Sequence, residues 1–234
     1  MKLRPLFKGL FTIFRSHYFI PGNGLVFVGQ MARLSKWIHK HKKQAGYSDF
    51  YDIHFRYNKR EDLFRYLIET EKIDAVDYIE FGVAEGCSFK WWVANNLNSD
   101  SRFVGFDTFT GLPEDWGPFK KGDMSANNEP PKIDDNRHQF IQGLFQQTLP
   151  GFLTSFEFKN RKVIHMDADL YTATLYVLTS IAPYLNKGDI IMFDEFNVPM
   201  HEFKAFTEFV NSYYIDFEVL GAVNNFYQIA VKIK

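Results

Sequence analysis

The chain has 234 residues, of which 46% are hydrophobic and 18% are aromatic, so it can bury the core of an ordinary single domain. Its 27 Lys and Arg nearly balance 28 Asp and Glu, giving a formal net charge of -1, and this balance argues against nucleic acid as a partner. The single cysteine, Cys87, excludes an intramolecular disulfide. A reducing compartment fits this composition, and we expect a cytoplasmic location.

The first 20 residues combine a basic start with apolar side chains at helical spacing. These apolar residues are Leu3, Phe7, Leu10, Phe11, Phe14 and Tyr18. Charged residues interrupt the run, so it does not reach the ~20 uncharged residues of a membrane span. Two interpretations stay open: a helix that lies on a membrane surface, or a helix that packs on the domain or on a second copy of the chain. The packing interpretation is favoured, and it leaves a homo-oligomer open.

Two more helices are expected before the pattern changes, at residues 25–43 and 59–72. In the second of these, Leu63, Tyr66 and Leu67 share one face. We therefore treat residues 1–72 as an N-terminal helical extension that serves packing, oligomerisation or capping of a substrate site.

From residue 76 onward, short apolar strands alternate with helices. Strands are expected at 76–82, 102–107, 138–143, 162–167 and 189–194, and helices at 88–97, 172–185 and 201–214. Two strands at 217–223 and 226–233 close the chain as an antiparallel hairpin at the sheet edge. This alternation predicts one α/β domain over residues 73–234, with a mostly parallel sheet covered by helices on both faces.

The stretch DYIEFGVAEGCSF, residues 77–89, leaves the first strand through a turn with two glycines, Gly82 and Gly86. Ligands of such sheets bind beyond the carboxyl ends of the strands, and the free amides at a helix start favour an anion. The spacing differs from the G-x-G-x-x-G of dinucleotide sites. Glu80 would repel a pyrophosphate but would hold an ammonium group. The turn therefore fits an amino acid, although two glycines also occur in such turns for packing alone.

A second acid, Asp107, ends the second strand about 20 residues past Gly86, where nucleoside-binding folds place a carboxylate on the ribose hydroxyls. The alternative is that Asp107 caps a turn. An amino-acid end and a ribose end on adjacent strands together predict S-adenosylmethionine as the ligand.

At this point the chain resembles the class I S-adenosylmethionine-dependent methyltransferases, and more narrowly the macrocin O-methyltransferase family. The matching stretches are YIEFGVAEGCSF, FVGFDTFTGLPEDW, GLFQQTLP, HMDADLYTATLYVLTSIAPYL and GDIIMFDEFN. They cover about residues 77 to 197, whereas the first 50 residues and the last 20 carry no matching motif.

The resemblance implies a Rossmann-like, doubly wound, seven-stranded sheet whose last strand is antiparallel. It also implies a set of cofactor-binding residues: Glu80, Gly82, Gly86 and Ser88 around the methionyl part, Asp107 on the ribose, Gln142, Gly143 and Phe145 at the adenine, and Asp169 beside them. An amide and an aromatic ring do suit the edge and face of a purine.

Four acids should meet where the fourth and fifth strands end: Asp167, Asp169, Asp194 and Glu195. Such carboxylates repel one another unless they share protons or bind a cation, and hard oxygen ligands favour Mg²⁺. The alternative is that these acids cap helices, Asp169 above all. The resemblance places a divalent metal on Asp167, Asp194 and Glu195, the last where the family has Asp or Asn. The general base stays open: Asp167, acting from beside the metal, is the catalytic candidate, with His165 and His201 as alternatives.

These features predict a metal-dependent O-methyltransferase that acts on a hydroxyl of a small molecule, such as a sugar or a glycosylated natural product. Residues 108–137 form a long polar connection, in which Trp116 and Phe119 suggest a lid over substrate. Two alternatives remain. One is a nucleotide-sugar glycosyltransferase that uses the Asp-Ala-Asp of residues 167–169 for a metal, and the other is a methyltransferase-like domain kept for binding or assembly.

Overall fold

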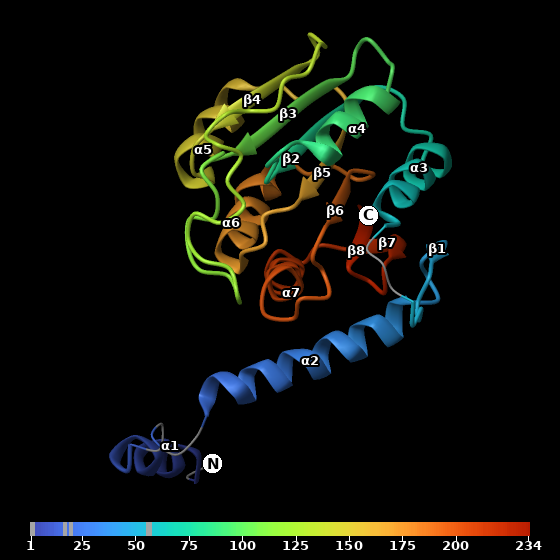
Figure 1. The fold of residues 1–234 in the computed structure, drawn as a ribbon. Coiled ribbons are helices and arrows are strands. Elements are labelled where there is room, and N and C mark those ends of the chain that lie inside the picture. Colours follow the sequence, from blue (N-terminus) through green and yellow to red (C-terminus); the bar gives the residue numbers. More distant parts are fainter. Residues whose placement is uncertain (1–2, 16–17, 19–20, 55–57) are drawn as a thin grey trace.

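A computed structural model describes residues 3–15, 18, 21–54 and 58–234 (Figure 1). Eight strands form one sheet in the order β1-β7-β8-β6-β5-β2-β3-β4. The strands are β1 (Tyr47–Ser48), β2 (Val76–Phe81), β3 (Arg102–Asp107), β4 (His138–Gln142), β5 (Arg161–Met166), β6 (Ile190–Phe193), β7 (Phe217–Val223) and β8 (Gln228–Ile233). All neighbours pair in parallel except β8, which runs antiparallel to both β6 and β7.

The last strand is antiparallel, as expected, but the expected number of strands is too low by one. The additional strand, β1, pairs in parallel with β7 and covers the edge of the hairpin. It has two residues, which is too short for any alternation of apolar and polar side chains to mark it in the sequence.

Helices cover both faces of the sheet. They are α1 (Leu3–Ile13), α2 (Gly22–His41), α3 (Arg60–Thr70), α4 (Cys87–Asn95), α5 (Phe145–Ser155), α6 (Tyr171–Ile181) and α7 (Glu202–Ser212), with a short 3₁₀ turn, η2 (Ala182–Tyr184), after α6. Buried residues of α2, α5, α6 and α7 share one core cluster, and those of α3 and α4 share the other. The sheet is therefore doubly wound.

The strand β2 lies at the centre of both clusters, with all six of its residues buried. Successive side chains point to opposite faces. On one face Phe81 stacks on Phe106, with ring centroids 4.9 Å apart; on the other Tyr78 stacks on Trp92 at 5.0 Å. Aromatic packing thus fixes β2 from both sides and holds the position of the turn that follows it.

The N-terminal helices project from the rest of the molecule (Figure 1). The C-terminal half of α2 packs on the domain through Leu34 and Ile38. In α1 and the first half of α2, large apolar side chains such as Ile13 and Phe27 are exposed. No helix in the described residues is long and apolar enough to cross a bilayer. A homo-oligomer stays a prediction.

The chain runs outward in one direction from β2 to β3 and β4, and then in the other from β5 to β6. The strands β2 and β5 are hydrogen-bonded neighbours, so the strand order reverses between their carboxyl ends. In open α/β sheets, the crevice at such a switch point is where ligands bind.

Candidate functional site

The carboxyl ends of the parallel strands are joined by backbone hydrogen bonds at one rim of the sheet. The amide of Asp167 donates to the carbonyl of Phe81 at 2.9 Å, and the amide of Asp194 donates to the carbonyl of Met166 at 3.0 Å. The first residues beyond β5 and β6 are thereby held beside the end of β2.

Gly82 is required at this rim because two chain segments meet there. Its φ is +96°, and a Cβ at this position would lie 1.7 Å from the carbonyl oxygen of Asp167. The missing side chain therefore makes room for the neighbouring strand. Gly86, at φ +78°, precedes α4 as its N-cap residue, as the glycine turn predicted.

Glu80 is 1% exposed and points from β2 into a buried polar chain. The Tyr78 hydroxyl donates to Glu80 Oε2 and also lies 2.9 Å from His165 Nδ1. Burial raises the pKa of Glu80 to about 8, and burial lowers the pKa of His165 to about 4. The polar chain links the glycine turn to the strand that carries the acids.

Asp107 closes the turn from the side of β3. Its Oδ2 accepts the backbone N–H of Ala84 at 2.7 Å, and its Oδ1 accepts that of Phe109 at 2.6 Å. Asp107 is thus both the turn cap that its position allowed and a wall residue of the main cavity.

Of the three residues expected at an adenine, Phe145 lines a cavity, whereas Gln142 and Gly143 do not. Phe145 lines the main cavity and packs edge-on against Phe81 at 5.3 Å. The Gln142 amide instead donates to the Thr108 carbonyl at 3.1 Å and to Asn128 Oδ1 at 2.7 Å. Gln142 and Gly143 are not among the residues that line either cavity, while Leu144 is.

The four acids predicted beyond β5 and β6 do meet. Ligand atoms of Asp167, Asp169 and Glu195 lie within 4.8 Å of one another, and so do those of His165, Asp167 and Asp194. Burial and the nearby Asp194 charge raise the pKa of Asp167 to about 8. Burial and Asp167 raise the pKa of Asp169 to about 7. The acids therefore repel one another, and the cluster keeps protons at a pH where a solvated carboxyl would have lost them.

Several carboxylate oxygens in this acid cluster are buried and have no hydrogen-bond partner: Asp194 Oδ1, Glu195 Oε2 and Glu202 Oε1. Glu202, the first residue of α7, uses its other oxygen to accept the Glu195 amide at 2.9 Å. Buried unpaired carboxylate oxygens are costly, so each of these oxygens needs a proton or a cation as a partner. Sequence reasoning missed Glu202, because a helix-starting Glu is commonplace.

Arg60, which sequence reasoning also missed, brings a positive charge to the cluster. Its guanidinium donates to Asp194 Oδ2 and lies 3.8 Å from Asp167 Oδ2. Burial disfavours the charged form, but Asp194 and Asp167 outweigh it and raise the pKa of Arg60. The one signal in the sequence was a cation at the start of a helix, where acids are normally favoured.

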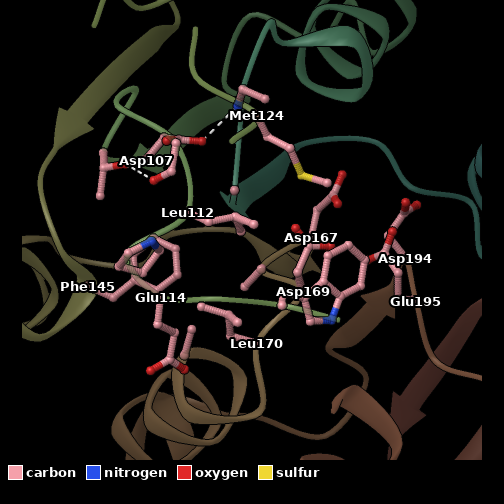
Figure 2. A pocket seen from close by; sticks show the side chains of 18 of the residues that line it. Asp107, Leu112, Glu114, Met124, Phe145, Asp167, Asp169, Leu170, Asp194 and Glu195 are labelled. Carbon is pink, nitrogen blue, oxygen red and sulfur yellow. Dashed lines mark hydrogen bonds between the residues drawn. The ribbon is translucent and has the colours of Figure 1, made fainter. Parts of the chain in front are cut away.

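Two cavities adjoin at this rim. The main one, of about 590 Å³, contains most of the predicted residues: Gly82, Asp107, Phe145, Asp167, Asp169, Asp194 and Glu195. The second, of about 310 Å³, contains Glu80, Gly86, Ser88 and again Asp167. Figure 2 shows Met124 pointing from the connection after β3 toward Asp167, and Met124 lines both cavities.

The connection after β3 forms the outer wall of the main cavity. It folds back on itself through Leu112, whose amide donates to the Asp123 carbonyl at 2.9 Å. Trp116 and Phe119 stack at 5.3 Å and both line the cavity. Trp116 and Phe119 thus add an aromatic surface to the wall of this cavity.

Comparisons with known proteins agree with this geometry. A family model described as a methyltransferase domain matches residues 79–196, half of the chain. The chain belongs to this methyltransferase family. The matched region runs from within β2 to just beyond β6, so it contains Asp107 and the acids that follow β5 and β6, whereas Arg60 and Glu202 lie outside it.

Two curated relatives are methyltransferases of glycosylated natural products. The chain is 29% identical over 163 residues to 8-demethyl-8-(2,3-dimethoxy-alpha-L-rhamnosyl)-tetracenomycin-C 4'-O-methyltransferase of Streptomyces olivaceus, covering 60% of this chain and 61% of that enzyme. It is 26% identical over 177 residues to mycinamicin III 3''-O-methyltransferase of Micromonospora griseorubida, covering 62% and 68%. The similarity therefore spans about three fifths of the first enzyme's length.

Among solved structures, the crystal structure of CalS11, a calicheamicin methyltransferase, superposes with a TM-score of 0.57 at 20% identity. The match covers 88% of this chain and 91% of that one. At this identity the likeness concerns the fold alone.

Proposed function

We propose that this protein is an S-adenosylmethionine-dependent O-methyltransferase acting on a hydroxyl group of a small molecule, a sugar or a glycosylated natural product, as in the macrocin O-methyltransferase family. One observation carries the proposal. Asp107 and the acid cluster line a single cavity at the switch point of the sheet, where a nucleoside and an acceptor would lie side by side.

The cofactor would extend across both cavities. Its methionyl part would lie in the second cavity, where Glu80 meets the amine and Gly86 and Ser88 meet the carboxylate. Its ribose would bind Asp107, and Phe145 would contact the adenine. Asp167, which lines both cavities, would then lie near the methyl group.

The acid cluster fits a divalent cation such as Mg²⁺, because buried carboxylate oxygens without partners remain at Asp194 and Glu195. Asp167, Asp194, Asp169 and Glu195 would hold it. Such an ion, when bound, lowers the pKa of an acceptor hydroxyl and fixes its direction.

The chain's own residues have three tasks in methyl transfer. Asp167 would accept the hydrogen bond of the acceptor hydroxyl and take its proton, which aligns the oxygen with the methyl group. Met124, with Trp116 and Phe119 of the same connection, would exclude water from the reacting atoms. Glu80, which is 1% exposed, would fix the amine end of the cofactor.

The lining of the main cavity also restricts the acceptor. Six carboxylates line it, those of Asp107, Glu114, Asp167, Asp169, Asp194 and Glu195, and among its described lining residues Arg60 is the only Lys, Arg or His. A phosphorylated acceptor would meet repulsion on most sides. We therefore infer a neutral or cationic acceptor with an apolar part that packs on Trp116 and Phe119.

The test combines binding with turnover. Isothermal titration should show that S-adenosylhomocysteine binds and that Asp194→Asn weakens Mn²⁺ binding at least tenfold, whereas Glu69→Gln, an exposed change on α3, leaves both unchanged. Methyl transfer from labelled S-adenosylmethionine is then measured on neutral glycosides and on UDP-sugars. We expect label on the glycosides alone, with an increased KM in Trp116→Ala.

The outcomes separate the alternatives. Tight binding of a UDP-sugar with Mn²⁺, and none of S-adenosylhomocysteine, would favour the glycosyltransferase. Cofactor binding without transfer to any acceptor in a broad panel would favour a binding protein. The methyltransferase family match speaks against the glycosyltransferase.

A further inference from the structure

Arg60 is the first residue of α3, but its side chain does not stabilise that helix. A cation in the first turn opposes the helix dipole, and α3 already has acids there, Glu61 and Asp62. The guanidinium instead reaches Asp194, just beyond β6 and more than 130 positions away in the chain, and Ser88 at the start of α4. The position of Arg60 is therefore explained by these partners.

The same side chain lies at the junction of the two cavities. Arg60 lines both, as do Ala84, Met124 and Asp167. Its Nη2 donates to Asp194 on the acid side, while its Nη1 donates to Ser88 Oγ at 3.1 Å on the side of the glycine turn. One planar group thus contacts both halves of the site.

The guanidinium does not complete the acid cluster. Asp194 Oδ1 and Glu195 Oε2 remain buried without a partner although Arg60 is present. A divalent cation would satisfy these oxygens, but it would also lie close to the guanidinium of Arg60. Two positive groups this close repel each other.

We propose that Arg60 is a positioning residue that exchanges between two anionic partners: the Asp194 carboxylate when the cluster is without metal, and the carboxylate of the amino-acid part of the ligand in the second cavity when metal is bound. Ser88 accepts a hydrogen bond from Arg60 Nη1, the nitrogen that moves least when the guanidinium changes partner. The inference rests on the proposed function, because it assumes that the protein binds a divalent cation and S-adenosylmethionine.

Exchange of one guanidinium couples the two ligands. A bound cation releases Arg60 to the cofactor, and a bound cofactor removes Arg60 from the cation's site. Each ligand must then strengthen the other by the same factor, since coupling between binding sites is reciprocal.

The experiment is a binding cycle by isothermal titration on the full chain, with Mn²⁺ and S-adenosylhomocysteine as probes, each measured alone and with the other saturating. In the wild type we expect each probe to tighten the other at least fivefold. In Arg60→Met, Mn²⁺ alone should bind at least tenfold tighter than to the wild type, and the coupling should fall below twofold. Methionine keeps the length and apolar stem but removes the charge.

The matched control is Arg65→Met, on the same helix, where the guanidinium pairs with exposed Glu61 and Asp62; it should leave every constant unchanged. If Arg60→Met does not fold, Arg60→Gln, which also removes the charge, replaces it and must strengthen Mn²⁺ binding and weaken the coupling by at least threefold each. Unchanged or weaker Mn²⁺ binding, or coupling that persists without Arg60, overturns the inference. Failure of the wild type to bind either probe would instead refute the proposed function.

Discussion

Asp107 accepts a hydrogen bond from the Ala84 amide at 2.7 Å, which ties the end of β3 to the glycine turn after β2. The acid that would bind a ribose therefore also fixes the loop that would bind the methionyl part. A single substitution at this position acts on both halves of a cofactor site.

Asp107→Ala should weaken S-adenosylhomocysteine binding by ~10- to 100-fold, the range for lost hydrogen bonds to a charged group. Isothermal titration measures this. Asp100→Ala is the control, because Asp100 is exposed at the opposite end of the same strand. Equal affinity in both variants would refute the ribose assignment.

Gly82→Ala should cost far more stability than Gly188→Ala. Both glycines have nearly the same backbone conformation, with φ of +96° and +98°, but a Cβ would lie 1.7 Å from Asp167 O at Gly82 and meets nothing within 4 Å at Gly188. The conformation alone costs about 1–2 kcal/mol. Urea unfolding of the two variants separates the cost of the steric clash from the cost of the backbone conformation. An equal loss of unfolding free energy in both variants would show that the backbone around Asp167 moves to accommodate the added Cβ.

Asp77→Ala should reduce the free energy of unfolding by about 3–5 kcal/mol, because it leaves a guanidinium without its partner. The fully buried Asp77 carboxylate pairs with Arg102 at 2.7 Å and accepts the amides of Lys159 and Asn160. Asp62→Ala breaks an exposed pair with Arg65 and should stay within error in the same denaturant titration.

His41 should make stability depend on pH. Burial lowers the pKa of His41 below 6.5, so the unfolded chain binds this proton more readily than the folded one. The contribution of the neutral His41 ring to the free energy of unfolding is therefore complete above pH 6.5, and it is lost as the pH falls toward the pKa of His41 in the folded protein. Unfolding curves at pH 7.5 and 5.5 should differ more for the wild type than for His41→Phe, which keeps an aromatic ring beside Trp37.

Much of the sheet follows from the sequence because buried strands form apolar runs between clear boundaries. The strand expected at 102–107 is β3 to the residue. The helix α5 was not expected, since Pro150 lies within it and proline normally interrupts a helix. Tertiary packing through Leu149 and Phe152, both buried, outweighs that preference.

The acid cluster was predictable for a similar reason. Parallel strands place their carboxyl ends at one edge, so Asp167 and Asp194 had to meet once β5 and β6 were adjacent. Arg60 was not predictable, because its contact depends on the reach of a long side chain from a helix on another part of the sheet. Gln142 shows the converse: its place at the carboxyl end of a strand was expected, but the direction of its side chain was not.

The short strand β1 has a practical consequence for anyone trimming this protein. Its two residues occupy the open edge of β7, and the Gly46 amide adds a hydrogen bond to the Leu220 carbonyl at 2.9 Å. A shortened chain that starts after residue 48 would leave that edge bare, and bare edges invite strand pairing between molecules. Removing α1 and the exposed first half of α2, while keeping the half that buries Leu34 and Ile38, would leave both the core and this strand edge covered.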